Sequence, residues 1–164
     1  MNPTYFQELY DYTAWANRRL WDCTATLSDE QFASIREPLL HVVAVERWWL
    51  HFLRTGALPS FDELASWSRE TLRAKWDEVD ASNREYLATL TPEELERRVR
   101  PPFWEGDKQP IKAWEALIQV ANHSTDHRAQ IMKDIGALGG TGVEQDFLTY
   151  LFEKQKQKGQ RSSL

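Results

Sequence analysis

Apolar residues recur along this chain at intervals of three and four positions, the period of an α-helix with one buried face. The clearest case opens the chain, where Asn2 is placed to cap a helix and Pro3 takes its first position. This helix is expected to end near Thr26. Its apolar stripe consists of Phe6, Leu9, Thr13, Ala16, Leu20, Cys23 and Leu27. No strand-length alternation of Val, Ile and Thr competes with this period, so the sequence predicts an all-α fold.

Similar signals predict the other helices. A short turn of helix is expected after the capping box at residues 28–31, followed by a separate helix from about Pro38 to Thr55 that Gly56 ends. Later helices are expected from residue 66 or 68 to about 90, briefly from 91, from about 110 to 138, and from about 143 to 156. Between them, residues 98–110 contain three prolines and Gly106, which indicates irregular structure or a small hairpin.

The number and length of these helices predict a four-helix bundle with one crossover connection and a short additional C-terminal helix. The crossover is expected in the loop at residues 55–66. With 164 residues the chain fits one domain, which we expect to span residues 1–156 and to be followed by a polar tail at 157–164.

The composition of the chain bears on its cellular compartment and on the partners it can bind. The chain has 25 acidic and 20 basic residues, a balance that disfavours binding to nucleic acid. Its longest apolar stretch, residues 39–53, is interrupted by Glu46 and Arg47 and is too short to span a bilayer. Cys23 is the only cysteine, so no intramolecular disulfide is possible, and no signal peptide is recognisable. We therefore expect a soluble, cytoplasmic protein without a membrane partner.

Two of the four histidines, His123 and His127, stand four residues apart within an expected helix. This spacing puts both imidazoles on one face, where they can reach the same ion. They share a row with Val120, Ile131 and Ile135 that is expected to face the core. The alternative is that each histidine is a core residue bonded to a backbone carbonyl, and the pair alone does not decide between the two.

His41 favours the metal site over core histidines, because it lies on an expected inward face of the second helix. Three neutral nitrogen donors from two helices suit Zn²⁺, Ni²⁺, Cu²⁺ or Fe²⁺ and leave at least one coordination position open. His51 is displaced around the same helix and is expected to be a surface or packing residue. The sequence therefore predicts a site for one divalent metal at His41, His123 and His127.

Three segments carry a resemblance to a known family. Residues 11–17 read DYTAWAN, residues 40–50 read LHVVAVERWWL, and residues 120–131 read VANHSTDHRAQI. Together they resemble the DinB/YfiT-like family of bacterial proteins, which includes predicted metalloenzymes. Thr13 departs from the asparagine of the family's first pattern, whereas none of the three metal histidines is missing.

The resemblance implies an up-down-down-up four-helix bundle, a homodimer, and a metal held by His41, His123 and His127. Relatives include thiol transferases that use low-molecular-weight thiols, a thiol-dependent isomerase, and products of genes induced by DNA damage or stress. The resemblance thus implies a bound metal, and zinc or nickel is expected. It defines the reaction less well than the metal site.

The first functional hypothesis is a metal-dependent S-transferase. Metal coordination would convert a low-molecular-weight thiol to its thiolate, which would then attack an electrophile. Trp48 and Trp49, with Trp104 in the proline-rich loop, are the candidates to bind the co-substrate or the electrophile.

Two alternatives stay open beside the transferase. The first is a hydrolase that uses a metal-bound hydroxide, and the second is a non-enzymatic metal-binding protein of the stress response. A carboxylate close to the histidines would favour the hydrolase. Asp126 and Glu46 are the candidates for a base or a supporting residue, and no side chain is assigned as catalytic.

Overall fold

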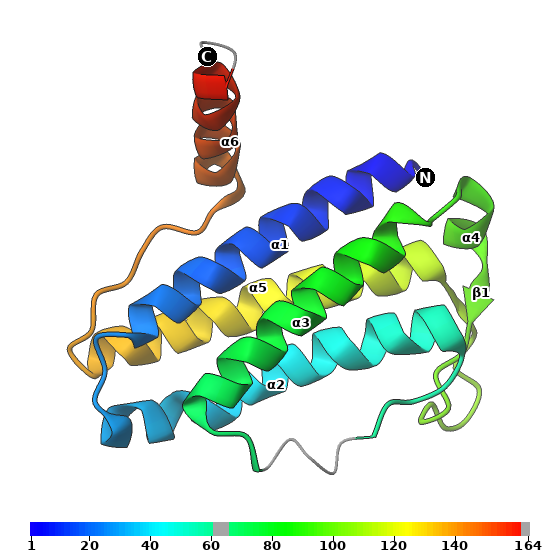
Figure 1. The fold of residues 1–164 in the computed structure, drawn as a ribbon. Coiled ribbons are helices and arrows are strands. Elements are labelled where there is room, and N and C mark those ends of the chain that lie inside the picture. The colour runs from blue at the N-terminus through cyan, green and yellow to red at the C-terminus, as the bar shows by residue number, and fades with distance from the viewer. Residues whose placement is uncertain (61–65, 162–164) are drawn as a thin grey trace.

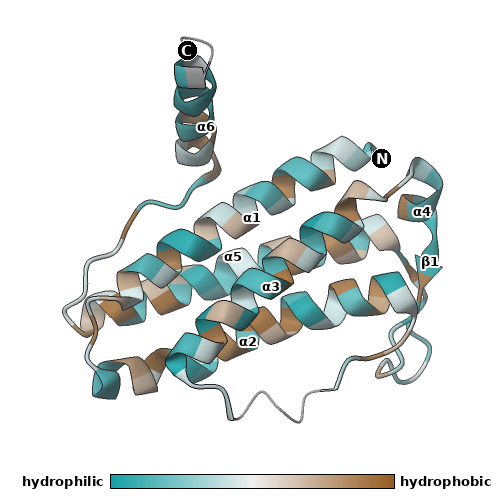
Figure 2. Cartoon of the chain, in the orientation of Figure 1, coloured by the Kyte–Doolittle hydropathy of each residue, from teal (hydrophilic) through white to brown (hydrophobic). Residues whose placement is uncertain are grey.

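The computed structural model describes residues 1–60 and 66–161 (Figure 1). Its elements are α1 (Pro3–Thr24), α2 (Asp29–Thr55), α3 (Arg69–Ala88), α4 (Pro92–Glu96), β1 (Arg98–Val99), β2 (Ile111–Lys112), α5 (Ala113–Ala137) and α6 (Phe147–Arg161). The helical prediction is confirmed. Hydrophobic and hydrophilic residues alternate along α1 and α3 in Figure 2, as expected for helices that bury one face.

The helix ends follow the capping residues of the sequence. The side chain of Asn2 accepts a hydrogen bond from the Thr4 amide, with Pro3 next to it at the first helical position. Ser28 and Gln31 form the predicted capping box at the start of α2. At the other end of α2, Gly56 has φ of 74°, a left-handed conformation that costs glycine little.

Four long helices form the bundle with the expected crossover. Helices α1 and α5 run in one direction and α2 and α3 in the other, so the order is up-down-down-up (Figure 1). Helix α1 packs on α3 and α5, and α2 packs on the same two, which places α1 and α2 on one diagonal. The predicted connection between α2 and α3 includes residues 61–65, which lie outside the described residues.

The expected helix boundary at Pro38 is wrong, because α2 runs unbroken from Asp29 through that proline. A proline within a helix removes one backbone hydrogen bond and costs about 3 kcal/mol. Phe32, Ile35 and Leu39 are all buried in one apolar cluster, and their row continues across the proline. Their burial, with the capping box at the start, offsets that cost.

Smaller differences occur at two other ends. Helix α5 begins at Ala113 rather than near residue 110, because Ile111 and Lys112 pair with Val99 and Arg98 in the small hairpin. Helix α6 continues to Arg161, so residues 157–161 of the expected tail are helical, whereas 162–164 lie outside the described residues. None of the described helices is long and apolar enough to cross a membrane.

A layer of buried polar side chains separates the two larger of the three apolar clusters in the described core. One cluster joins the C-terminal end of α1 to the start of α2, and the other joins the start of α1 to the end of α2. Between them, all four long helices contribute polar groups, here named the polar layer: Asn17, Glu46, Asp80, Ser124 and Arg128. Burying such groups is tolerable only where they bond one another.

Candidate metal centre

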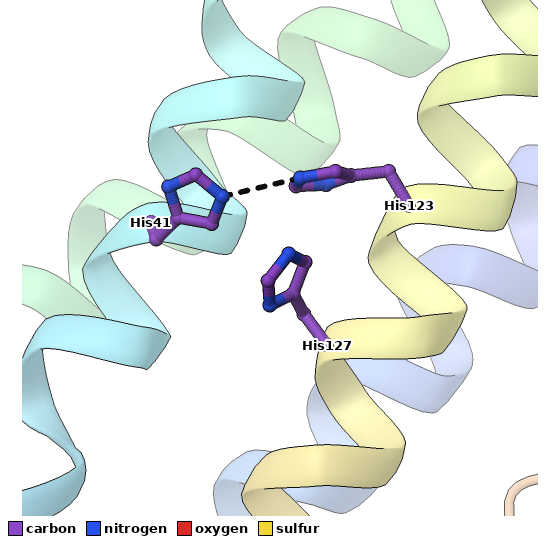
Figure 3. A group of neighbouring side chains, drawn as sticks. All are labelled: His41, His123 and His127. Atoms are coloured by element: carbon purple, nitrogen blue, oxygen red, sulfur yellow. Dashed lines mark hydrogen bonds between the residues drawn. The ribbon is translucent and has the colours of Figure 1, made fainter.

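The three predicted histidines meet between two helices. His41 projects from α2, whereas His123 and His127 project one turn apart from α5 (Figure 3). One ring nitrogen of each lies within 4.8 Å of those of the other two. The Nε2 atoms of His41 and His123 are 3.1 Å apart. Small rotations of the rings would therefore direct all three at one ion.

The cluster lies at the surface rather than in the core. His41 is exposed, and His123 and His127 are half-buried. Of the row predicted to face the core, Val120, Ile131 and Ile135 are buried, but the two histidines are not, because the buried row of α5 passes through Ser124 and Arg128 instead. The exposure of the cluster gives a ligand access from solvent.

The surroundings favour the neutral form of two of the imidazoles. The pKa of His123 is lowered to about 4, first by burial and then by the neighbouring His127 and His41. The pKa of His41 is also lowered, first by burial and then by His127. A neutral imidazole has a lone pair to give to a metal, so these shifts favour metal binding near neutral pH.

The hydrogen bonds bear on the alternative of ordinary core histidines. Nδ1 of His123 is buried and has no hydrogen-bond partner among the described residues. No cysteine, aspartate or glutamate of residues 1–60 and 66–161 belongs to the cluster. Structural zinc sites usually have four protein ligands, whereas catalytic sites have three and an open position. The donor set thus fits a divalent transition metal and leaves room for a substrate.

An apolar pocket of about 440 Å³ adjoins the cluster, and His41 forms part of its wall. Trp48 and Trp49 line it, and their binding role stays a prediction, while Phe103 contacts them from the loop after β1. Trp104 is not among its lining residues, and the adjacent Phe103 stands where Trp104 was expected. The composition of the loop indicated an aromatic wall but not which of the two rings would form it.

Comparison with known proteins identifies the family of this chain. The family model described as the DinB family matches residues 1–160. The chain belongs to the DinB family. It is 26% identical over 165 residues to Protein DinB of Bacillus subtilis (strain 168), in an alignment that covers 92% of this chain and 96% of that protein.

The two carboxylates considered as supporting residues have different surroundings in this DinB-family fold. Asp126 is exposed on α5. Glu46 is buried, accepts a hydrogen bond of 2.7 Å from Ser124 Oγ, and also accepts one from Asn17 Nδ2. Glu46 therefore belongs to the polar layer and not to the histidine cluster.

Sequence reasoning missed most of the polar layer. Asn17 Nδ2 also bonds Asp80 Oδ1, and Arg128 Nη1 donates to Asn17 Oδ1 over 3.1 Å. The signal was present, since Glu46 interrupts a long apolar run and Arg128 follows His127 directly. A search for apolar periodicity passes over polar residues that occupy core positions.

Cys23 is buried in the apolar cluster at the C-terminal end of α1, as predicted. Burial raises the pKa of its thiol, which makes the reactive thiolate scarcer at neutral pH. The chain thus offers a place for a metal but no accessible cysteine nucleophile, since Cys23 is its only cysteine.

Proposed function

We propose that this chain is a metal-dependent S-transferase. His41, His123 and His127 would hold one divalent ion, and the co-substrate would be a low-molecular-weight thiol. The convergence of three imidazoles at an accessible position carries this proposal, because they leave a coordination position open. Membership of the DinB family agrees with it.

The chemistry follows from that arrangement. A bound divalent ion lowers the pKa of a coordinated thiol, so that the sulfur is a thiolate near neutral pH. The sulfur forms a bond to an electrophilic carbon, the leaving group departs with the bonding electron pair, and the thiol proton passes to solvent. The protein holds the sulfur and the carbon together at the cluster and supplies no nucleophile of its own.

Three imidazole donors restrict the choice of metal ion but do not identify the ion. Imidazole nitrogen suits zinc, nickel, copper and iron, and availability in the cell decides among them. We propose zinc or nickel.

The contacts favour the transferase over the two alternatives. A hydrolase that activates water gains from a nearby carboxylate base, but Glu46 is bonded within the polar layer and Asp126 is exposed. A purely structural site would be expected to have a fourth protein ligand, and three are present in the described cluster. The homodimer, the cytoplasmic location and the role in the stress response stay predictions.

Thiol transfer to 1-chloro-2,4-dinitrobenzene tests the proposal. The metal-loaded protein, the chelator-treated protein and His127→Ala would be compared with a panel of low-molecular-weight thiols. We expect a thiol-dependent rate that chelation or His127→Ala lowers by about 100-fold or more.

His51→Ala is the matched control, because it removes the histidine of α2 outside the cluster and should keep the rate. An equal rate in His127→Ala, or no transfer with any thiol by the zinc-loaded and nickel-loaded proteins, would contradict the proposed function.

A further inference from the structure

The pocket beside His41 is built mainly from one face of α2. His41, Ala44, Val45 and Trp48 follow one another at helical spacing and form its floor. Trp49, Leu58 and Phe103 complete the lining. A molecule in this pocket would touch His41 directly, so the pocket opens onto one of the three residues of the cluster.

The lining has almost no polar character. Apart from the imidazole of His41, the described side chains that line the pocket are apolar or aromatic, and none of them is charged. Two basic residues of α2, Arg47 and Arg54, line a different groove with His51 and residues of α3. A charged group on a ligand would lose hydration in the apolar pocket and gain no partner there.

The aromatic side chains of the pocket contact one another edge to face. The ring centres of Trp48 and Phe103 are 4.7 Å apart, and those of Trp48 and Trp49 are 4.8 Å apart. Aromatic rings at such distances bind other rings by stacked or edge-to-face contact. The pocket of about 440 Å³ lies within the size range of small-molecule sites.

The wall formed by Phe103 is held in place by its own loop. The guanidinium of Arg100 donates to the carbonyl oxygens of Trp104, Gly106 and Lys108. Phe103 itself is 53% exposed and Leu58 is 43% exposed. Two large apolar side chains thus stand open to solvent at the mouth of the pocket, where an apolar ligand would cover them.

We propose that the acceptor of the transfer reaction is an uncharged aromatic electrophile that binds in the pocket against Trp48 and Phe103, with its reactive carbon toward His41. This inference rests on the proposed function and adds the class of substrate. In the step, sulfur forms a bond to that carbon, the leaving group departs with the electron pair, and the thiol proton goes to solvent.

The first test measures binding without reaction. Titration calorimetry with the unreactive 1,3-dinitrobenzene on chelator-treated protein should show one site, and Phe103→Ala should weaken it about tenfold. Phe152→Ala, which removes a similarly exposed ring from α6, is the matched control and should bind like the parent. Equal affinity in Phe103→Ala would overturn the inference.

A second copy of the chain is another possible occupant of this apolar mouth. Sedimentation of the parent and of Phe103→Glu separates the two cases. If Phe103→Glu splits a dimer, and the parent fails to bind 1,3-dinitrobenzene, the pocket is an interface and the inference is overturned. Binding by the parent at its normal oligomeric state supports a substrate site.

The decisive test compares 1-chloro-2,4-dinitrobenzene with the anionic 4-chloro-3,5-dinitrobenzoate, each corrected for its uncatalysed rate. We expect the metal-loaded protein to favour the neutral compound by tenfold or more, and Phe103→Lys to reverse much of that preference. Equal use of both compounds would overturn the substrate class and leave the transferase intact. Binding that depends on Phe103 without any transfer would instead contradict the proposed function and leave the aromatic pocket standing.

Discussion

Two polar clusters lie back to back on α2 and α5, and they differ in what their groups bond to. His123 and His127 are half-buried, whereas the residues that follow them, Ser124 and Arg128, face the core. Among the described residues, the hydrogen bond that these histidines form to another element is the one between His41 and His123. The polar layer is bonded within itself across all four long helices, although Asp80 Oδ2 and Arg128 Nε have no partner there. Polar groups that bond one another in the core indicate a structural role, and imidazoles that converge at the surface indicate a ligand site.

The pKa shifts show the same contrast. Burial of His41 and His123 favours their neutral form, which frees a lone pair. The pKa of Asp80 is raised to about 7, first by burial and then by the charge of Glu46, so the layer retains a proton instead. Substitutions in the layer should therefore change stability strongly, and substitutions in the cluster should change metal binding.

The largest effect is expected from Arg128→Met. It removes the cation that faces Glu46 and Asp80 and leaves Asn17 Oδ1 without its donor. Removing one partner from a buried charged network costs about 3–5 kcal/mol. Urea unfolding would measure the loss, with the exposed Lys133→Met on the same helix as control, expected within about 0.5 kcal/mol of the parent. A loss below about 1 kcal/mol for Arg128→Met would show that the layer is not a structural unit.

Asp80→Asn tests the retained proton. The folded pKa of about 7 lies above the ordinary 3.8, so the native state binds a proton more tightly than the unfolded chain. The stability due to this group is complete below pH 3.8 and is lost as the pH rises to about 7, by at most about 4 kcal/mol. Asp80→Asn should abolish this fall and be more stable than the parent at pH 8.

The control for that experiment is Asp77→Asn on the same helix. Asp77 pairs with Arg73 at the surface, and its loss should change stability by less than about 1 kcal/mol without a matching change in pH dependence. If the parent and Asp80→Asn show the same pH profile from 4 to 8, Asp80 is ionised in the folded protein and the assignment fails.

Ser124→Ala should have an intermediate effect. It removes the 2.7 Å hydrogen bond to Glu46 and leaves a buried carboxyl oxygen with one donor fewer. The expected loss is about 1–3 kcal/mol, measured by urea unfolding. The neighbouring Thr125→Ala also removes a hydroxyl from α5. Thr125 donates to the Ala121 carbonyl and accepts from Arg128 Nη2, both on its own helix, so its loss breaks no bond between helices and should be smaller. The reverse order would contradict the bridging role of Ser124.

The smallest effect on metal-free stability is expected from His41→Ala, since this side chain is exposed and forms one contact to His123. We expect a change below about 1 kcal/mol. Added Zn²⁺ at about 100 times its dissociation constant should stabilise the parent by about 2.7 kcal/mol and leave His41→Ala unchanged. Equal stabilisation of both proteins would show that the ion binds elsewhere.

Sequence periodicity predicted the bundle well because its four helices carry strong caps and regular apolar rows. It failed at Pro38, where local propensity indicates a break but burial of Phe32 and Ile35 continues the helix. Tertiary packing decides such cases, and a single chain does not display it.

The candidate site was predicted in its residues but not in its position. The spacing of His123 and His127 placed them on one face of the helix. Neighbouring residues are rotated by about 100° around the helix axis, which is enough to put one at the surface and the next in the core. The polar layer was not predicted because Glu46 and Arg128 occupy core positions usually taken by apolar residues. The place of Phe103 in the pocket wall was not predicted because the conformation of a loop does not follow from periodicity.

Metal content of the purified protein tests the central claim most directly. Mass spectrometry on protein expressed without a histidine tag and without added metal, beside His123→Ala and His127→Ala, would give the ratio of metal to chain. We predict close to one transition metal ion per chain in the parent and almost none in the two variants, with helical circular dichroism unchanged. A metal-free parent that also fails to bind added Zn²⁺ or Ni²⁺ would contradict the account, as would variants that keep the full metal content.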